Sequence, residues 1–412
     1  MKKKLYVFAC ITIPLFSATH FLPEKVQLPI GRFLDDTKNI FYNTYYNAYV
    51  SPYLLSCAFQ QSKLACMQAF NEHPINPNCF IDEELLKHKM SQGLPKWALT
   101  QIQQDLSTFG SISKADLKRY LIENNTTENA LMRIQVKNKK ITVTYNNPKH
   151  RLKNKISLSH TAGTIQLVIK YLAKNGYIPD SDFILAIGDF YEPINDQPVP
   201  IFTFAKNLDI PVERSLILIP DWQNLGSARD LRQRIRNTKK LIAWNDKKNQ
   251  LFWRGGKLDS TGFRKKFIAF SENYPSLIDA QYVNTYGQGA KPNKRFVSPE
   301  EHLNYKYLIS IDGLRCSWER LIWHLHSNSL IFKHQTNQIQ WYYNGIKPYE
   351  HYIPITDEHS ILASIAWAEN HPHEVQTIIH NASTFVEDNL SLEDMYHYIA
   401  VLLQEYHKKL AD

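Results

Sequence analysis

The stretch that decides the fold reads LFWRGGKLDSTGFR and covers residues 251–264. The apolar run Leu251 to Trp253 predicts a buried strand, and the segment from Gly262 to Glu272 predicts the helix that follows it. Small residues after a strand allow a ligand to approach closely, and cations beside a helix N-terminus favour a bound diphosphate. The spacing matches neither Walker A nor GxGxxG, so the common ATPase and dinucleotide sites are not supported. Glycines that serve packing alone are the alternative interpretation.

Strands and helices alternate on both sides of this stretch. Upstream, a helix that ends at Gly176 precedes the apolar run Phe183 to Ile187, which predicts a buried parallel strand. Downstream, a helix over 317–326 separates the predicted strands 307–311 and 329–333. Such alternation is typical of βα units and predicts an α/β fold with two Rossmann-like halves. A ligand is then expected where the carboxyl ends of the strands face the cleft.

Further elements complete this prediction. A half-buried strand is expected where Ile141, Val143 and Tyr145 alternate with threonines. Ser391 and Asp394 have the spacing of a helix capping box. The other predicted elements are strands at 216–219 and 277–283, helices at 228–237, 372–388 and 392–409, and a hinge near 211–222.

Length and composition place the chain among globular proteins. Its 412 residues are enough for two or three domains with a large core, and 43% hydrophobic against 21% charged residues argues against disorder. Five cysteines are too few for a disulfide framework in a chain of this length. Cys57, Cys66 and Cys79 cluster near the N-terminus and could form one or two bridges, whereas the lack of a CxxC pair gives a zinc site little support.

The N-terminus has the pattern of a secretory signal. Three lysines after Met1 precede the apolar stretch Leu5 to Ala18. That stretch is shorter than the roughly 20 apolar residues that cross a bilayer. Residues 1–20 are therefore expected to be a cleaved signal, with cleavage near Ser17, or a retained membrane-surface anchor.

Positive charge is concentrated in one window. The net charge is +9, and residues 229–266 alone carry 13 basic side chains against three aspartates, which leaves the rest of the chain at −1. A second window, residues 133–155, has eight basic side chains and no acid. Such windows favour a polyanionic partner such as a nucleotide diphosphate, a phosphorylated lipid or a nucleic acid. A solvated basic face is the alternative.

Several motifs carry a family resemblance. They are FWRG at 252–255, Asp279-Ala280, HLNYKYLISIDG at 302–313, CSWER at 316–320, SNSLIFK at 327–333, WYY at 341–343 and KPYEHYIP at 347–354. In this order they resemble glycosyltransferase family 90, the capsule-associated and lipopolysaccharide-modifying glycosyltransferases that are related to animal protein O-glucosyltransferases. The resemblance covers roughly residue 182 to the C-terminus.

The resemblance implies a GT-B fold, in which two Rossmann-like domains face a cleft. It divides the chain into a signal-like segment (1–20), an acceptor-side domain (21–215), a nucleotide-sugar-binding domain (216–390) and a C-terminal helix (391–412) that packs back on the N-terminal domain. It further implies an inverting enzyme that moves glucose or xylose from a UDP-sugar. The acceptor would be a hydroxyl of a glycan, a lipid-linked saccharide, a lipopolysaccharide or a protein.

An inverting transfer of this kind needs one base for the acceptor hydroxyl. Related enzymes place an acidic residue after an apolar strand, and Asp189 follows the run from Phe183 to Gly188 in that way. Asp189 is therefore the predicted catalytic base. Glu192 is the rival base, and a helix cap is the structural alternative for Asp189.

The predicted donor site uses cations, glycines and polar groups in place of a metal ion. Ser317 would hold phosphate or cap a helix, and Glu319 would accept from ribose hydroxyls or lie on the surface. The full predicted set is Arg254, Gly255, Lys257, Arg264, Gly313, Ser317, Glu319 and Arg320. No metal ion and no cofactor beyond the UDP-sugar substrate are expected, because no Asp-x-Asp signature ends a predicted strand.

Two functions and two compartments stay open at this stage. The competing function is a non-catalytic polyanion- or nucleic-acid-binding protein that uses the basic residues 229–266. Against it, this window lacks the interleaved aromatic residues of RRM and OB surfaces, so no nucleic-acid partner is expected. The signal-like start favours membrane association or the secretory pathway, whereas the need for a nucleotide sugar favours the cytoplasmic membrane face in a bacterium.

Overall fold

The computed structural model describes residues 81–124, 129–146, 156–188, 191, 198–283 and 297–411. All of these residues belong to one compact unit of the chain, Ile75–Asp412. Several predictions lie outside the described residues: the signal-like segment, the cluster of Cys57, Cys66 and Cys79, and both candidate bases, Asp189 and Glu192. Within the described ranges, no helix is long and apolar enough to cross a membrane.

The first sheet has five strands in the order β3-β2-β4-β5-β7. They are β2 (Leu131–Lys137), β3 (Lys140–Tyr145), β4 (Ser181–Ala186), β5 (Ile201–Thr203) and β7 (Ile217–Leu218). β4, β5 and β7 run parallel, whereas β2 pairs antiparallel with both β3 and β4. The buried strand predicted at 183–187 is confirmed, but this half has a mixed sheet rather than a purely parallel one.

The antiparallel part of this sheet arises from a tight hairpin. Lys137 pairs with Lys140, so Asn138 and Lys139 alone form the turn between β2 and β3. Both turn residues have positive φ, 51° and 63°, as in a type I′ turn, whose twist matches that of the flanking strands. Exposed and half-buried residues alternate along β3, as the sequence predicted.

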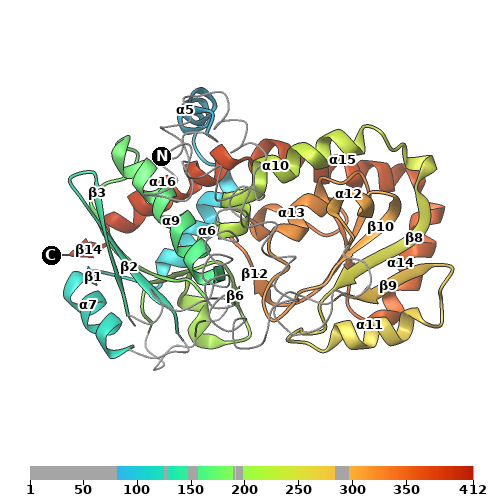
Figure 1. The fold of residues 1–412 in the computed structure, drawn as a ribbon, viewed down its shortest axis with the longest axis horizontal. Helices are drawn as coiled ribbons and strands as arrows, with labels where there is room; N and C mark the ends of the chain where they lie inside the picture. The colour runs from blue at the N-terminus through green and yellow to red at the C-terminus, as the bar shows by residue number, and fades with distance from the viewer. Residues whose placement is uncertain are drawn as a thin grey trace, which may run out of the picture. The chain divides into compact units, whose positions relative to one another are not determined.

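Helices from both ends of the chain surround the first sheet. They are α5 (Glu83–Gln92), α6 (Lys96–Ser107), α7 (Lys114–Glu123), α9 (Ile156–Lys174) and α16 (Leu392–His407). The predicted capping box of Ser391 and Asp394 begins α16, which packs against α5, α6 and α9 (Figure 1). The Tyr406 hydroxyl donates to the Asp182 carbonyl at 3.1 Å, and β14 (Leu410–Ala411) pairs with β1 (Ile112–Ser113). The C-terminal segment therefore lies on the half of the molecule that holds the first sheet.

The second sheet is entirely parallel, in the order β13-β11-β10-β8-β9. Its strands are β8 (Lys248–Gly255), β9 (Ile278–Tyr282), β10 (Tyr305–Ser310), β11 (Leu330–His334) and β13 (Ile353–Ile355). Its helices are α11 (Phe263–Ser271), α12 (Pro299–His302), α13 (Glu319–Leu325), α14 (Glu358–Asn370) and α15 (Pro372–Asn389). The predicted alternation of strands and helices is confirmed in this half, although α14 was not predicted.

One helix leads from the first sheet to the second. α10 (Trp222–Lys239) begins six residues before the predicted helix 228–237, because Asp221 caps its N-terminus by accepting from the Asn224 amide at 3.0 Å. β7 ends just before this cap. The helix is therefore fixed at the carboxyl end of a strand of the first sheet.

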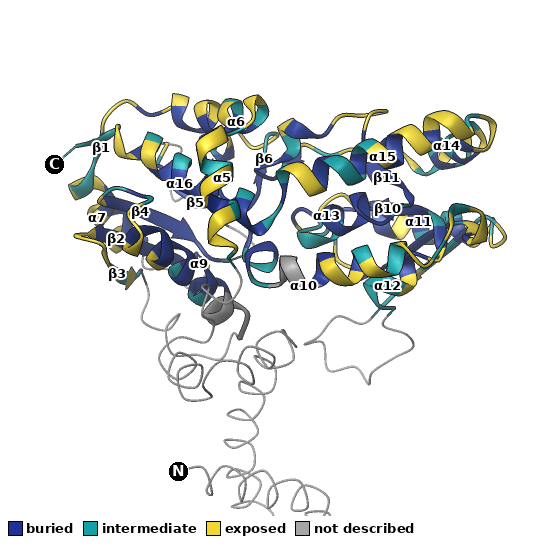
Figure 2. Cartoon of the chain, turned by 90° about the horizontal axis from the view of Figure 1, so that it is seen from above, coloured by how far each residue is buried: buried dark blue, intermediate teal, exposed yellow. Residues whose placement is uncertain are grey.

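A short two-stranded ribbon joins the two sheets. β6 (Lys206–Asn207) follows the carboxyl end of β5, β12 (Gln338–Ile339) follows the carboxyl end of β11, and the two pair antiparallel. One hydrophobic cluster extends from β4 and β5 to Phe252 and Leu308 of the second sheet, and Figure 2 shows the buried strands beneath helices with exposed outer faces. The carboxyl ends of strands from both sheets therefore meet at the β6–β12 ribbon.

Candidate functional site

A polar pocket of about 540 Å³ lies beside the β6–β12 ribbon. It is lined by Asn207, Asp209, Ser260, Thr261, His334, Gln335, Thr336, Asn337 and Gln338. The lining combines residues that follow β5, the loop before α11, and the segment between β11 and β12. Its position at the carboxyl edge of a parallel sheet is where a ligand was expected, and its amide and hydroxyl groups suit a sugar or phosphate.

Hydrogen bonds hold the pocket wall together across the two halves. Asn337 Nδ2 donates to Asp209 Oδ1 at 2.6 Å, which links the β12 side to the residues after β6. Gln338 Nε2 donates to Ser260 Oγ at 2.7 Å, which links β12 to the loop before α11. The wall is therefore built from three separate segments of the chain whose spacing these side chains fix.

His334 contributes a neutral ring to the same wall. Its imidazole stacks on Phe263 with ring centroids 3.8 Å apart. Burial, with a smaller effect of the neighbouring Lys333 ammonium, lowers the pKa of His334 to about 4. At neutral pH the ring is therefore uncharged and can donate from one nitrogen and accept at the other.

Arg264 clamps the loop after β8 to the loop after β10. Its buried guanidinium donates to the carbonyls of Gly256 (3.0 Å) and Leu258 (3.1 Å), and also to those of Ile311 and Asp312 (both 3.0 Å). The predicted contact of Arg264 with donor phosphate stays a prediction. In the structure this side chain shapes the two loops that hold Lys257, Gly313 and Ser317 of the predicted donor set.

Asp312, which was not among the predicted site residues, organises the second of these loops. One carboxylate oxygen accepts from the Ser317 amide at 3.1 Å and the other from the Thr336 hydroxyl at 2.6 Å. Burial raises the pKa of Asp312, and the nearby Lys333 ammonium opposes that shift. The Asp-Gly pair at the end of a predicted strand was a usable signal, because an acid there commonly holds the turn that follows.

The start of α13 differs from the prediction. The helix begins at Glu319 rather than at Ser317, and Trp318 occupies the position before it with φ 49°. A left-handed backbone at a tryptophan is strained, and such strain is often found at ligand sites. Ser317 does not cap this helix with its side chain; its hydroxyl lies 2.9 Å from the hydroxyl of Ser310.

The end of β8 serves packing. A Cβ atom at Gly255 would come within 2.4 Å of the Trp253 ring, so packing alone requires a glycine here, and the predicted contact of Gly255 with the donor stays a prediction. Trp253 itself lies in the core. Arg254 is buried and donates to Asp279 Oδ1 at 2.7 Å and to the Asp279 carbonyl at 2.9 Å, so its predicted contact with donor phosphate would compete with an internal ion pair.

The remaining predicted donor residues are more accessible. Lys257 is exposed, and its ammonium lies 5.8 Å from the centre of the Tyr282 ring. Glu319 and Arg320 are half-buried at the start of α13. Burial and the nearby charge of Arg264 lower the pKa of Arg320 to about 10, so it stays charged at neutral pH. Gly313 is half-buried, and its carbonyl accepts from the Ser260 amide at 3.0 Å.

The basic window does not form one charged face. Arg232, Lys247, Arg254 and Arg264 are buried. Others form ion pairs, including Arg234 with Glu300 and Lys239 with Glu387. The reason is that residues 229–266 cross from α10 through β8 to α11, which lie in different places in the fold. Within the described ranges there is also no group of three or more His, Cys, Asp or Glu side chains that could hold a metal ion.

These features define an α/β protein with a polar pocket where the carboxyl ends of two sheets meet. The model of glycosyl transferase family 90 matches residues 95–411, so the chain belongs to this family. The match begins well before residue 182, where the resemblance was expected to start, and it takes in α6, α7 and the whole of the first sheet.

Curated relatives and one solved structure extend this comparison. Protein O-glucosyltransferase 2 of Danio rerio is 24% identical over 330 residues, which cover 75% of this chain and 62% of that protein, so the chain spans less than two thirds of its length. Protein O-glucosyltransferase 1 of Homo sapiens is 24% identical over 352 residues, which cover 77% of this chain and 87% of the relative. The crystal structure of Anabaena HepE in complex with UDP is 6% identical, with a TM-score of 0.31, and covers 50% of this chain and 72% of that one.

Proposed function

We propose that this chain is a glycosyltransferase that moves a sugar from a UDP-sugar to a hydroxyl group of a protein or glycan. Membership of family 90 and the curated relatives named O-glucosyltransferases support this activity. The observation that carries the proposal for this chain is the Arg264 clamp, which holds the loops after β8 and β10 together beside a polar pocket. Loops at the carboxyl edge of a parallel sheet are the usual place for a nucleotide.

The donor would bind on the side of the second sheet. The exposed Lys257 on the loop after β8 and the half-buried Arg320 at the start of α13 are both charged at neutral pH and are the cations proposed to meet the diphosphate. Cations aimed at the departing diphosphate stabilise the negative charge that develops in the transition state. No divalent ion is needed for that role, and metal-independent transfer is part of the proposal.

The acceptor hydroxyl would be activated by Asp189. Its oxygen attacks the anomeric carbon of the donor sugar while the bond from that carbon to the diphosphate oxygen breaks. The hydroxyl proton passes to the Asp189 carboxylate, and UDP leaves with the bonding electron pair. Attack from the face opposite the leaving group inverts the anomeric centre. Asp189 directly follows Gly188, where the described segment that contains β4 ends, and this position in the chain supports the role.

Glucose or xylose is the proposed sugar. A pocket lined by hydroxyl, amide and imidazole groups suits a hexose or pentose, because each sugar hydroxyl both donates and accepts hydrogen bonds. Lipid-linked saccharides and lipopolysaccharide are further proposed acceptors. An association of residues 1–20 with a membrane surface would bring the enzyme to such acceptors.

Ligand-dependent thermal stability tests this proposal. A ligand that binds only the native state raises the free energy of unfolding, and with it the melting temperature, with the logarithm of its concentration relative to Kd. We expect UDP, UDP-glucose or UDP-xylose to stabilise the full chain in the presence of EDTA, with GDP as the control for base recognition. Stabilisation by single-stranded nucleic acid alone, falling steeply with salt, would replace the transferase by the polyanion-binding function.

A further inference from the structure

A buried ion pair connects the loop after β10 to the other half of the molecule. Arg315 lies in that loop, and Glu213 lies in the 3₁₀ helix η3 (Pro211–Ser215), close to the first sheet. Both N–H···O contacts of the guanidinium with the carboxylate are 2.8 Å long, and both side chains are buried. Paired, parallel contacts of this kind fix the orientation as well as the distance between the two groups.

The backbone of Arg315 shapes the loop that holds two predicted donor residues. Its carbonyl accepts from the Gly313 amide at 2.7 Å, and the Gly313 carbonyl accepts from Ser260 in the neighbouring loop. Ser317 follows two residues later and donates its amide to Asp312. A shift of the Arg315 side chain would therefore move residues 312–317, which we call the donor loop.

Glu213 also contacts the wall of the pocket. Its Oε2 accepts from the amide of Asn207 at 2.7 Å, in addition to the Arg315 contact. Asn207 lines the pocket and pairs with Gln338 in the β6–β12 ribbon. One carboxylate therefore holds both the pocket wall and the donor loop.

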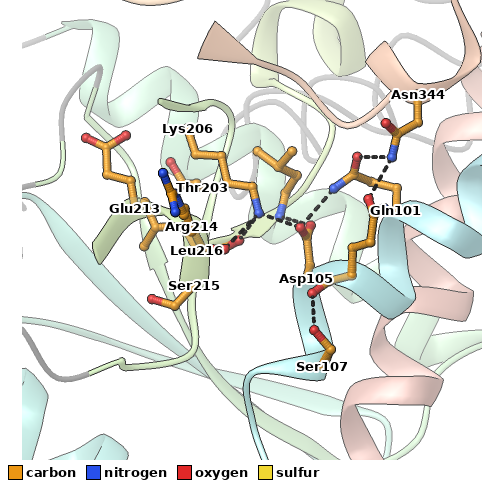
Figure 3. Close-up of polar contacts among 12 residues, drawn as sticks. Gln101, Asp105, Ser107, Thr203, Lys206, Glu213, Arg214, Ser215, Leu216 and Asn344 are labelled. Atoms are coloured by element: carbon orange, nitrogen blue, oxygen red, sulfur yellow. Dashed lines mark hydrogen bonds and ion pairs between the residues drawn. The ribbon is translucent and has the colours of Figure 1, made fainter. Parts of the chain in front are cut away.

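The 3₁₀ helix that carries Glu213 is itself held by a second buried pair. Lys206 Nζ donates to Asp105 Oδ1 at 2.6 Å and to the carbonyls of Arg214 (3.2 Å) and Leu216 (2.9 Å), at the end of η3 (Figure 3). The Asp105 carboxylate also accepts hydrogen bonds from the Gln101 side chain and from the Leu218 amide. The 3₁₀ helix that carries Glu213 is therefore held in place by a hydrogen-bonded ion pair between Lys206 and Asp105 of α6.

We infer that Glu213 is a positioning residue that sets the donor loop for the nucleotide through its ion pair with Arg315. The inference rests on the proposed function, because the donor loop is assigned to the UDP-sugar there. Glu213 belongs to the half of the molecule that holds the first sheet, so the pair makes the shape of the donor loop depend on how the two halves are joined. Binding of the donor and the contact between halves are then linked.

A double-mutant cycle on UDP affinity tests this inference. Glu213→Gln, Arg315→Gln and the double variant remove the pair, and misplacement of a binding loop costs about tenfold or more in affinity. We expect each single variant to raise Kd for UDP about tenfold and the double variant to be no worse than the singles, because groups that act as one unit are not additive. The donor KM should rise while the acceptor KM at saturating donor stays within about twofold.

A matched pair in the first sheet separates positioning from stability. Arg133 and Asp182 form a buried two-contact ion pair, with N–H···O distances of 2.7 and 2.5 Å, between β2 and β4. Asp182→Asn should lower the free energy of unfolding as Glu213→Gln does, yet leave Kd for UDP unchanged. Arg315→Lys keeps the positive charge but loses the paired contacts with the carboxylate. It replaces the glutamine variants in the UDP-binding measurement if they do not fold.

Three outcomes decide between the hypotheses. Weakened UDP binding by folded Glu213→Gln or Arg315→Lys, with unchanged binding by Asp182→Asn, supports the inference. UDP binding within twofold of the parent protein in all of them overturns it and leaves the proposed function intact. If the parent protein itself binds no UDP, the proposed function fails first and the inference fails with it.

Discussion

Arg264 reaches from the first turn of α11 to the end of β10, where its Nε donates to the carbonyl of Asp312 at 3.0 Å. The contact couples the two loops at the carboxyl edge of the second sheet, because the same guanidinium also donates to Gly256 and Leu258. Arg264 was predicted to contact donor phosphate because of its charge, but in the structure its guanidinium donates to backbone carbonyls. Its loss should affect stability and ligand binding together.

Arg264→Lys should reveal this coupling. A lysine cannot replace the contacts with all four carbonyls, and a buried carbonyl left without a donor, as at Ile311 or Asp312, costs about 1–3 kcal/mol. We expect the free energy of unfolding to fall by about that amount and Kd for UDP to rise about tenfold, since the two loops lose their spacing. Urea denaturation and titration calorimetry measure both effects. The exposed neighbour Lys265, changed to alanine, is the control and should alter stability by no more than about 0.5 kcal/mol.

Asp189→Asn should separate chemistry from donor binding. The amide cannot take the proton of the acceptor hydroxyl, so turnover should fall by about two orders of magnitude or more. Kd for UDP should stay unchanged, because the diphosphate contacts other groups. Glu192→Gln is the matched control, and a large loss of turnover in that variant with an active Asp189→Asn protein would assign the base to Glu192.

Lys257→Ala should weaken donor binding without loss of stability. Lys257 is exposed on the loop after β8, so its removal leaves no buried group without a partner. A charge-assisted contact with a diphosphate is typically worth about 1.5–3 kcal/mol, which corresponds to a rise of roughly tenfold to a hundredfold in Kd. The exposed Lys266→Ala is the control for net charge. Equal UDP affinity of the two variants would remove Lys257 from the donor site.

Acid should destabilise the second half through His302. Burial, followed by the nearby charges of Arg320 and Arg254, lowers the pKa of His302 to about 3. In the unfolded chain a histidine titrates near 6.5, so this contribution to stability is complete above about pH 6.5 and is lost as the pH falls toward 3. From pH 8 to pH 5 the free energy of unfolding should therefore fall by about 2 kcal/mol because of His302.

His302→Phe removes the titrating group and tests this account. We expect its free energy of unfolding, measured in urea at pH 8 and pH 5, to fall less on acidification than that of the parent protein, by about 2 kcal/mol. His373 is exposed near the start of α15, and His373→Phe should retain the full pH dependence. An unchanged pH dependence in His302→Phe would mean that other groups account for acid destabilisation.

The elements of the second half could be predicted because their signals are local. β8, β10 and β11 each contain a short apolar run, and β9 alternates apolar with polar residues; such patterns can be recognised without knowledge of the rest of the fold. The mixed first sheet was less predictable, since the hairpin turn of Asn138 and Lys139 lacks the usual glycine. α14 was missed because its small and apolar residues are not confined to one face; Ala366 is exposed and Ile361 is buried.

The site was harder to predict than the fold. The charge of Arg254 and Arg264 drew attention to the loops after β8 and β10, but only the folded chain decides whether an arginine contacts a ligand, a carboxylate or a carbonyl. Glu213 and Arg315 are 102 residues apart in sequence, and neither lies in a pattern that points to the other. Local sequence motifs therefore cannot predict an ion pair of this kind.

Transfer should proceed without a divalent metal ion and with inversion of the anomeric centre. Cations near the donor loop would neutralise the diphosphate, and a single base on the opposite side of the sugar gives direct displacement. Activity measured after treatment with EDTA should equal that of the untreated enzyme, and the anomeric proton in the NMR spectrum of the product should show the configuration opposite to that of the donor. Recovery of lost activity by Mn²⁺ would contradict the metal-free mechanism. A product with the donor's own configuration would contradict the role of Asp189 as the only base, because retention requires two displacements or attack from the same face.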